Sequence, residues 1–340
     1  MAGGMSMSSK DWNPGTLLQL SGSYWQAFAL HAGVKLDIFS ILSRGPKDAV
    51  AVASHIQADL RGTRALLNAL AAMGLLEKNK DTYAAAPAAM SFLDKNAPGY
   101  VGHMILHHHH LSESWSRMDE AVRTGKPLGQ RSASTNDEDR RQAFLMGMYN
   151  LASQQAPHIA ALVDLSGRRH LIDVGGGPGT YAIHFCKQNP DLKAVVFDLP
   201  TTRPFAENCI DRHGLSDRIG FSEGDFLTTE IPGRYDVVWL SHILHAESPE
   251  DCRRLILKTV DSLEPGGLIF IHEFFLNENM DGPLFPALFA LNMLQGTERG
   301  QSYSEGQVRQ MLQAAGISGI QRLPYTGPTE SGILQGVFKG

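Results

Sequence analysis

Residues 171–198 place closely spaced glycines between two acidic side chains, a spacing suited to binding a nucleotide. An apolar run at 171–174 stops at the sequence GGGPG (175–179), and a second apolar run ends at Asp198. This order predicts a strand, a glycine loop, a helix and a strand with an acid at its tip, which is half of a doubly wound nucleotide-binding sheet. The glycines let backbone approach a ligand closely, and Asp198 can accept hydrogen bonds from both hydroxyls of a ribose.

The form of the glycine loop indicates which nucleotide it holds. A dinucleotide fingerprint requires another glycine at the position of Thr180, and no Lys-Ser/Thr pair marks a phosphate-binding P-loop. Glycines stand instead at 175, 177 and 179, and Asp173 precedes them. This spacing resembles the D-x-G-x-G-x-G loop of methyltransferases that use S-adenosylmethionine (SAM), a cofactor without phosphates. A tight turn that holds no ligand is the alternative.

Other polar side chains follow the next expected strands, near 219–225 and 235–242, whose carboxyl ends face the same ligand in such sheets. Asp225 can accept from an adenine amino group while Phe226 packs on the ring. A carboxylate that caps nearby loop amides is the alternative for Asp225. Ser241 ends the following strand and begins a loop that contains two histidines.

His245, in this loop, is the strongest candidate for catalysis. A phenol has a pKa of about 10 and is a poor nucleophile at neutral pH, so its methylation gains from a base. A neutral imidazole can take the phenol proton as the oxygen attacks. Glu273, expected at the end of a strand over 267–274, and Glu298 are the available acids to orient the ring. His242 is expected to pack or to belong to the cofactor loop.

Composition limits the class of protein that carries these residues. A chain of 340 residues suggests two domains, and 43% hydrophobic with 19% charged residues is ordinary for a globular protein. The net charge of −5 argues against binding to nucleic acid or to a membrane surface. Three scattered cysteines and the lack of a long apolar run favour a cytoplasmic protein.

The first part of the chain predicts a winged helix. Helical apolar spacing covers 17–45, 49–56 and 61–74, and a hairpin follows over 75–84. This region has few cationic side chains, Arg61 and Arg64 among them, and a surface that binds duplex DNA must neutralise several phosphates. We therefore expect the winged helix to serve packing or dimerisation. We therefore expect a mostly helical winged-helix dimerisation domain (1–112), linker helices (113–165) and a SAM-binding α/β domain (166–340).

The second half alternates strands and helices in the doubly wound order. Strands are expected near 170–174, 192–198, 219–225, 235–242 and 267–274, and a terminal antiparallel hairpin pairs 319–325 with 333–339. Ser248 followed by Pro249 predicts a helix start, and both Ser302 and Ser304 offer capping boxes for a later helix.

Taken in order along the chain, these motifs resemble the small-molecule O-methyltransferase family of plant caffeate-type enzymes and their bacterial relatives. The matches are DVGGGPG (173–179), DLP (198–200), GDF (224–226), L-H-x-x-x-x-E-D-C (244–252) and GTER (296–299). The resemblance implies a seven-stranded Rossmann-like domain, a homodimer, SAM as cofactor with S-adenosylhomocysteine as product, and no metal. It assigns catalysis to His245 with Glu273 and Glu298, and cofactor binding to Asp173, Gly175, Gly177, Asp198, Leu199, Asp225, Phe226 and Ser241.

The chain departs from the family pattern next to the base. The family reads His-Asp-Trp there, whereas this chain reads His245-Ala246-Glu247, and Ser241 stands where many relatives carry lysine. The acceptor side matches better: Phe144 and Met148 on the linker helices, with Phe289, Asn292 and Met293 on the stretch 288–300, correspond to pocket-lining positions. Ordinary helix packing is the alternative for each of them.

Four consecutive histidines (107–110) are peculiar to this chain. His103, His107 and His110 share one helix face, which can bind a metal, line a pocket or be an ordinary polar face.

We expect methyl transfer to a hydroxyl group of a small aromatic molecule. The alternatives are C-methylation of an aromatic or tetrapyrrole-like acceptor, a SAM-binding homologue with non-methylating chemistry, and, more remotely, a SAM-sensing winged-helix regulator or an NAD oxidoreductase.

Overall fold

The computed structural model describes residues 12–129 and 135–340. The chain divides into two compact units, Met1–His109 and His110–Gly340. The segment expected to form linker helices (113–165) lies within the second unit. The domain boundaries at residues 112 and 165 stay predictions.

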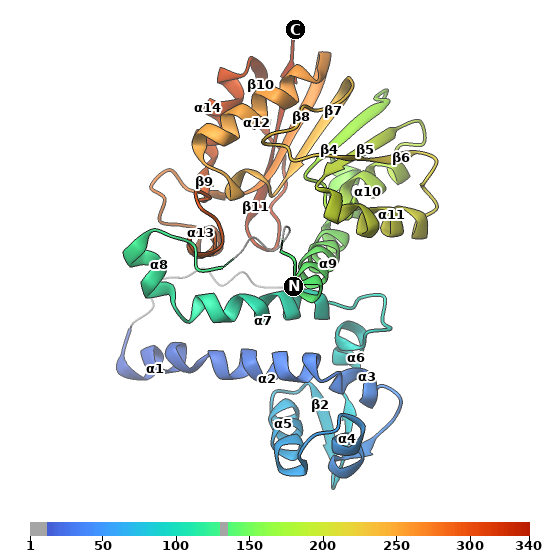
Figure 1. Ribbon diagram of the computed structural model, residues 1–340, viewed down its shortest axis with the longest axis vertical. Coiled ribbons are helices and arrows are strands. Elements are labelled where there is room, and N and C mark those ends of the chain that lie inside the picture. The colour runs from blue at the N-terminus through green and yellow to red at the C-terminus, as the bar shows by residue number, and fades with distance from the viewer. Residues whose placement is uncertain (1–11, 130–134) are drawn as a thin grey trace. The chain divides into compact units, whose positions relative to one another are not determined.

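The first unit contains the expected order of helix, helix and hairpin. The helices α4 and α5 lie beside β2, which opens the β2–β3 hairpin (Figure 1). Strand β1 completes a sheet of order β1-β3-β2. The helical stretch predicted over 17–45 is interrupted, because Asp37 has a φ of 58°, which a right-handed helix cannot continue. The elements are α1 (Pro14–Gly22), α2 (Tyr24–Lys35), α3 (Ile38–Leu42), β1 (Lys47–Asp48), α4 (Ala49–His55), α5 (Leu60–Ala72), β2 (Leu76–Asn79), β3 (Thr82–Ala85) and α6 (Pro87–Leu93).

Further helices follow, and the chain then enters the sheet of the second unit. These helices are α7 (Gly102–Trp115), α8 (Met118–Thr124) and α9 (Glu138–Leu162). The N-terminal end of α9 is fixed by Asp137, whose side chain accepts a hydrogen bond from the Arg140 amide. No helix in the described ranges is both long enough and apolar enough to cross a bilayer.

The main sheet has the order β10-β11-β8-β7-β4-β5-β6, and β9 adds a two-residue pairing to the end of β8. Strands β8, β7, β4, β5 and β6 run parallel, whereas β11 is antiparallel to β8 and to β10. The doubly wound seven-stranded fold and the antiparallel terminal hairpin are therefore confirmed. The strands are β4 (His170–Val174), β5 (Lys193–Asp198), β6 (Ile219–Glu223), β7 (Tyr235–Ser241), β8 (Leu263–Leu276), β9 (Tyr303–Ser304), β10 (Ile317–Arg322) and β11 (Ser331–Phe338).

Each face of the sheet has its own hydrophobic core, because successive side chains of a strand point to opposite faces. Val237 and Trp239 of β7 pack with α9, α10 (Thr180–Gln188) and α11 (Arg203–Arg212). Val238 and Leu240 pack with α12 (Pro249–Asp261) and α14 (Glu305–Ala314). Helices therefore cover both faces.

Helix caps set where the loops near the carboxyl edge begin and end. The Ser248 hydroxyl accepts from the Asp251 amide with Pro249 at the first position of α12, as predicted. Of the two capping boxes considered for α14, the one from Ser304 to Gln307 forms. The one from Ser302 does not, since the Ser302 hydroxyl donates to the carbonyl of Pro286 instead (2.8 Å).

Candidate active site

The glycine loop lies at the carboxyl end of β4, between β5 and β7. The chain continues from β4 to β5 and β6 on one side and returns to β7 on the other, so the strand order reverses at this point. Ligands of open α/β sheets bind in the crevice outside such a reversal. The loop is tied to β5 by the Gly175 amide, which donates to the carbonyl of Phe197 (2.7 Å).

The loop needs its glycines for two separate reasons. Gly175, Gly177 and Gly179 have φ values of 65°, 55° and 75°, in the left-handed region that favours glycine. In addition, a Cβ on Gly175 would lie 2.4 Å from the Cδ1 atom of Ile243, which precedes the candidate base by two residues. The cofactor loop and the base loop are therefore packed against each other.

Asp198, the acid at the tip of β5, faces the glycine loop. One carboxylate oxygen accepts from the Gly177 amide (2.8 Å), and the other accepts from the Leu199 amide (2.7 Å) and the Thr202 hydroxyl (3.2 Å). These bonds fix the carboxylate at the carboxyl edge, and a carboxylate oxygen has lone pairs for further donors. The position suits the predicted contact with ribose hydroxyls.

Asp173 is buried one strand away, and neither of its carboxylate oxygens has a hydrogen-bond partner among the described residues. Burial raises the pKa of Asp173 to about 7, and the charge of Asp198 adds to the increase. A buried carboxylate without a donor is costly, so this group fits a ligand that brings a positive charge or N–H donors. SAM carries an ammonium group and a sulfonium.

Asp225 and Ser241 are placed at the carboxyl edge but already have protein partners. One Asp225 oxygen accepts from the Leu227 amide (2.9 Å), the loop-capping contact considered as the alternative from sequence. Phe226 is half-buried and packs against one core. The Ser241 hydroxyl contacts the Nδ1 atom of His272 (3.1 Å), and Nε2 of that ring contacts Ser331 (3.0 Å). Cofactor contacts of these residues stay predictions.

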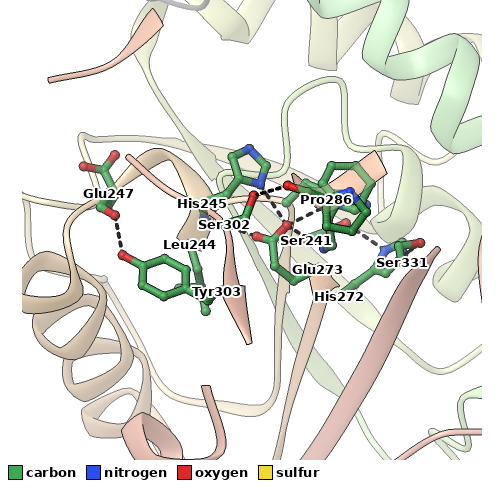
Figure 2. A network of polar contacts seen from close by, with 12 residues as sticks. Ser241, Leu244, His245, Glu247, His272, Glu273, Pro286, Ser302, Tyr303 and Ser331 are labelled. Carbon is green, nitrogen blue, oxygen red and sulfur yellow. Dashed lines mark hydrogen bonds and ion pairs between the residues drawn. The ribbon is translucent and has the colours of Figure 1, made fainter. Parts of the chain in front are cut away.

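His245 is buried in a short 3₁₀ turn (Leu244–Ala246) directly after β7. Its Nδ1 atom lies 2.8 Å from the Oε1 atom of Glu273, and its backbone amide donates to the other oxygen (3.3 Å), as Figure 2 shows. Because the carboxylate only accepts, Nδ1 carries the proton and Nε2 keeps its lone pair. The ring is thereby held in the tautomer whose Nε2 atom can accept a proton.

Glu273 lies inside β8, not at its end, because β8 continues to Leu276. Its carboxylate is fully buried and also accepts from the Phe274 amide (2.9 Å). Burial alone would raise the pKa of Glu273, but the attraction of the His245 ring when it is protonated and the hydrogen bonds from His242 and His245 hold that pKa well below its ordinary value. The group therefore stays ionised.

Two phenylalanines contact the candidate base, and a third packs on both of them. The His245 ring stacks on Phe274 (centroids 5.9 Å apart) and meets Phe289 edge to face (4.8 Å). Phe285 packs on both phenylalanines, and it lies with Phe289 on α13 (Leu284–Gly296). Phe289 was predicted from the sequence, whereas Phe274 and Phe285 were not. Two signals were available in the sequence: Phe274 directly follows Glu273, and Phe285 lies one helical turn before Phe289.

The remaining predicted acceptor residues come from α13 and α9. Asn292 accepts from the indole N–H of Trp115 (3.0 Å) and from Gln295 (2.9 Å), so Trp115 is a further residue missed from sequence. Met293 is buried. Phe144 and Met148 are half-buried on α9. The pocket role of these four residues stays a prediction.

Glu298 is exposed just after α13, and the described structure gives its carboxylate no hydrogen bond or ion pair. Its catalytic role therefore stays a prediction that the geometry does not support. The departure at Ala246-Glu247 is accommodated structurally: the Glu247 carbonyl accepts from the Tyr303 hydroxyl (2.6 Å), and the Cys252 thiol donates to the Leu244 carbonyl (3.1 Å). Figure 2 shows the first of these contacts beside the base.

The histidines of α7 do not converge on one point. His107 is buried, whereas His103 and His110 are half-buried, and the His103 ring packs on Tyr100. Burial, aided by the charge of Lys95, lowers the pKa of His103. Within the described ranges, these three do not form a group whose ligand atoms are close enough to share a metal ion.

The comparisons with known proteins agree with this architecture. The family model described as the O-methyltransferase domain matches residues 115–318, and the O-methyltransferase dimerisation domain matches 18–95. The chain is 32% identical to 3-hydroxy-5-methyl-1-naphthoate 3-O-methyltransferase of Streptomyces sahachiroi, covering 95% of each sequence. It is 27% identical to L-tyrosine C(3)-methyltransferase of Streptomyces lavendulae, covering 93% of this chain and 92% of that one.

A solved structure shares both the fold and the cofactor chemistry. Human N-acetylserotonin methyltransferase in complex with SAM superimposes with a TM-score of 0.84 at 25% identity, covering 98% of this chain and 99% of that one. The glycine loop at the strand reversal, Asp198 and the buried Asp173 fit this cofactor in the present chain. The protein therefore belongs to the O-methyltransferase family and is a SAM-dependent O-methyltransferase of small molecules with a family dimerisation domain.

Proposed function

We propose that the enzyme methylates a hydroxyl group of a small aromatic acceptor, with His245 as general base and Glu273 as the residue that orients it. The observation that carries this assignment is the buried contact between His245 Nδ1 and Glu273 Oε1 at 2.8 Å. That contact leaves Nε2 as the proton acceptor beside the phenylalanine rings.

The chain's own groups account for the steps around transfer. SAM, when bound, supplies an electrophilic methyl group on its sulfonium sulfur. His245 Nε2 accepts the acceptor's hydroxyl proton as its oxygen becomes nucleophilic, and the ionised Glu273 stabilises the imidazolium that forms. Glycine-loop backbone and Asp198 hold the adenosine side, with Asp173, Leu199, Asp225, Phe226 and Ser241 as further contacts. Positioning the two reactants in line supplies much of the rate.

The aromatic character of the acceptor is supported by the side chains around the base. Phe274, Phe285 and Phe289 offer flat apolar faces, on which an aromatic ring packs offset or edge to face. Two relatives carry names of aromatic hydroxyl substrates, 3-hydroxy-5-methyl-1-naphthoate and acetylserotonin. Phe144, Met148, Asn292 and Met293 complete the proposed pocket. A homodimer in the cytoplasm is part of the same proposal.

C-methylation is the second candidate function. It is supported by the similarity of this chain to a relative named L-tyrosine C(3)-methyltransferase. The same base would deprotonate a phenol so that a ring carbon becomes nucleophilic. The two products differ in chemistry. O-methylation gives an aryl ether, in which the methylated hydroxyl is no longer free, whereas C-methylation leaves the phenol hydroxyl free.

The test is transfer of a deuterated methyl group from labelled SAM into a small-molecule extract of the native cell, for wild type and His245→Ala. We expect one labelled product that requires the wild-type enzyme, and its fragmentation separates O- from C-methylation. SAM binding by both proteins, measured calorimetrically, controls for folding. Equal turnover by His245→Ala would remove the assigned base. A labelled non-aromatic product would overturn the acceptor class.

A further inference from the structure

His242 lies three residues before the candidate base, and its imidazole is the second one that contacts the buried carboxylate of Glu273. Its Nδ1 atom lies 3.4 Å from the same Glu273 oxygen that His245 contacts at 2.8 Å. One ligand atom from each of these three side chains lies within 4.8 Å of the others. Two imidazole nitrogens and a carboxylate oxygen are a recurrent ligand set for zinc, with a fourth position left for water.

The backbone of His242 is held in an unusual conformation that orients this ring. Its φ of 56° lies in the left-handed region, which costs a non-glycine residue about 1–2 kcal/mol. The conformation is fixed by the His242 amide, which donates to the carbonyl of His272 (2.8 Å). The ring packs at 4.2 Å from Phe274 with Nδ1 on the side of Glu273.

We infer that His242, His245 and Glu273 form an inhibitory site for a borderline transition-metal ion, with Zn²⁺ as the best match. Ligand atoms around a tetrahedral Zn²⁺ are roughly 3.3 Å apart, since each bond is about 2.0–2.2 Å long. The two observed separations from Glu273 Oε1, 2.8 and 3.4 Å, lie on either side of that value. All three ligand atoms lie within 4.8 Å of one another. Side-chain shifts of up to about 1.5 Å would therefore bring the two rings close enough to bind one ion together with Glu273.

Entry to the site and the reason for inhibition both follow from the geometry. The His242 side chain is 22% exposed, so an ion can reach it from solvent, whereas Glu273 is fully buried. A metal ion binds His245 through the Nδ1 lone pair, so Nδ1 must first lose its proton to solvent. Nε2 then takes up a proton from solvent. A ring protonated at Nε2 cannot accept a proton from the acceptor. This inhibition rests on the proposed role of His245, whereas binding of the ion does not.

The first test measures binding without turnover. Metal-free full-length protein is titrated with Co²⁺, whose visible d–d absorption reports tetrahedral coordination, and Zn²⁺ is then used to displace it. We expect one site per chain in wild type and its loss in His242→Gln. His108→Gln, on the histidine-rich helix α7, is the matched control and should keep the signal. An unchanged spectrum in His242→Gln, or its loss in His108→Gln, would overturn the site.

The second test measures inhibition of methyl transfer by Zn²⁺, relative to the metal-free rate of each variant. We expect micromolar Zn²⁺ to inhibit wild type reversibly with EDTA, and His242→Gln to require at least tenfold more. Equal sensitivity of both proteins contradicts the inference. If the cobalt site forms but His245→Ala leaves turnover intact, the proposed base has failed and the metal site stands. If the cobalt site is missing while His245→Ala abolishes turnover, the metal site has failed and the proposed base stands.

Discussion

Asp173 occupies a position that is unfavourable for the folded chain on its own. Its side chain is fully buried, and burial raises its pKa from 3.8 to about 7. Because the folded pKa exceeds the unfolded one, the native state binds this proton more tightly. The free energy of unfolding therefore falls as pH rises from about 4 to about 7, by at most about 4 kcal/mol. A loss of stability of this kind is typical of a buried ionisable group that serves to bind a ligand.

Replacing Asp173 with Asn tests this view, because the amide has the shape of the neutral acid. Without SAM, we expect Asp173→Asn to have a higher Tm than wild type at pH 8 and a much smaller difference at pH 4. With SAM, we expect affinity at pH 8 to fall at least tenfold, by calorimetry. A Tm difference that does not change with pH would contradict the raised pKa.

In the proposed mechanism Glu273 acts through His245, so substitution of Glu273 should affect turnover without affecting the binding of SAM or acceptor. In Glu273→Gln, the side-chain amide can present N–H to His245 Nδ1, which favours the proton on Nε2, where the lone pair is needed. We expect kcat to fall about 10²–10⁴-fold with little change in KM or SAM affinity. Glu273→Asp should recover part of the rate. A loss of SAM affinity equal to the loss in kcat would indicate a structural role instead.

At the scale of elements, the start of α12 fixes the end of the loop that carries the candidate base His245. Ser248 caps this helix three residues after His245, accepting from the Asp251 amide at 3.1 Å and donating to its carboxylate at 2.6 Å. We expect Ser248→Ala to lower the free energy of unfolding by about 1 kcal/mol, measured with urea. Ser216→Ala, at an exposed position, is the control and should change it by far less. Equal effects would show that the cap contributes nothing specific.

Helix α13 places one ring, Phe289, in direct contact with the candidate base His245, and it also exposes side chains to solvent. Phe289 meets His245 edge to face at 4.8 Å, whereas Leu288 is 46% exposed on the same helix. We expect Phe289→Ala to raise KM for an aromatic acceptor on the order of tenfold, because it removes both apolar area and a ring contact. Leu288→Ala should leave KM within twofold. An unchanged KM in Phe289→Ala would place the acceptor elsewhere.

Helices and strands that are specified by residues close together in the chain could be predicted from the sequence. Alternating or continuous apolar runs located β4, β5 and β7, and the cap at Ser248 located α12, since both depend on neighbours in the chain. Long-range packing decided the rest. Glu273 lies within β8 because that strand is extended by pairing with β11 and β9. The contact of Trp115 with Asn292 joins two segments whose spacing in the sequence carries no signal.

For the whole molecule, the relevant feature is that the N-terminal unit exposes several large apolar side chains. Large exposed side chains cluster on α1 and α2, where Leu18 is 73% and Trp25 is 70% exposed. Contiguous apolar surface of this kind marks an interface. Residues 18–95 match the O-methyltransferase dimerisation domain, which supports a homodimer. A second copy of the chain is therefore the expected cover for these two helices.

Two charged substitutions on these helices should separate the copies without unfolding either unit. Leu18→Glu with Trp25→Glu places carboxylates where the partner's apolar surface would desolvate them, at a cost of several kcal/mol. We expect light scattering to give the mass of one chain, and thermal unfolding to lose the concentration dependence that a coupled dimer has. Val50→Glu is the control, because Val50 is 57% exposed on α4, outside α1 and α2. A double variant that remains dimeric would mean that other surfaces hold the two copies together.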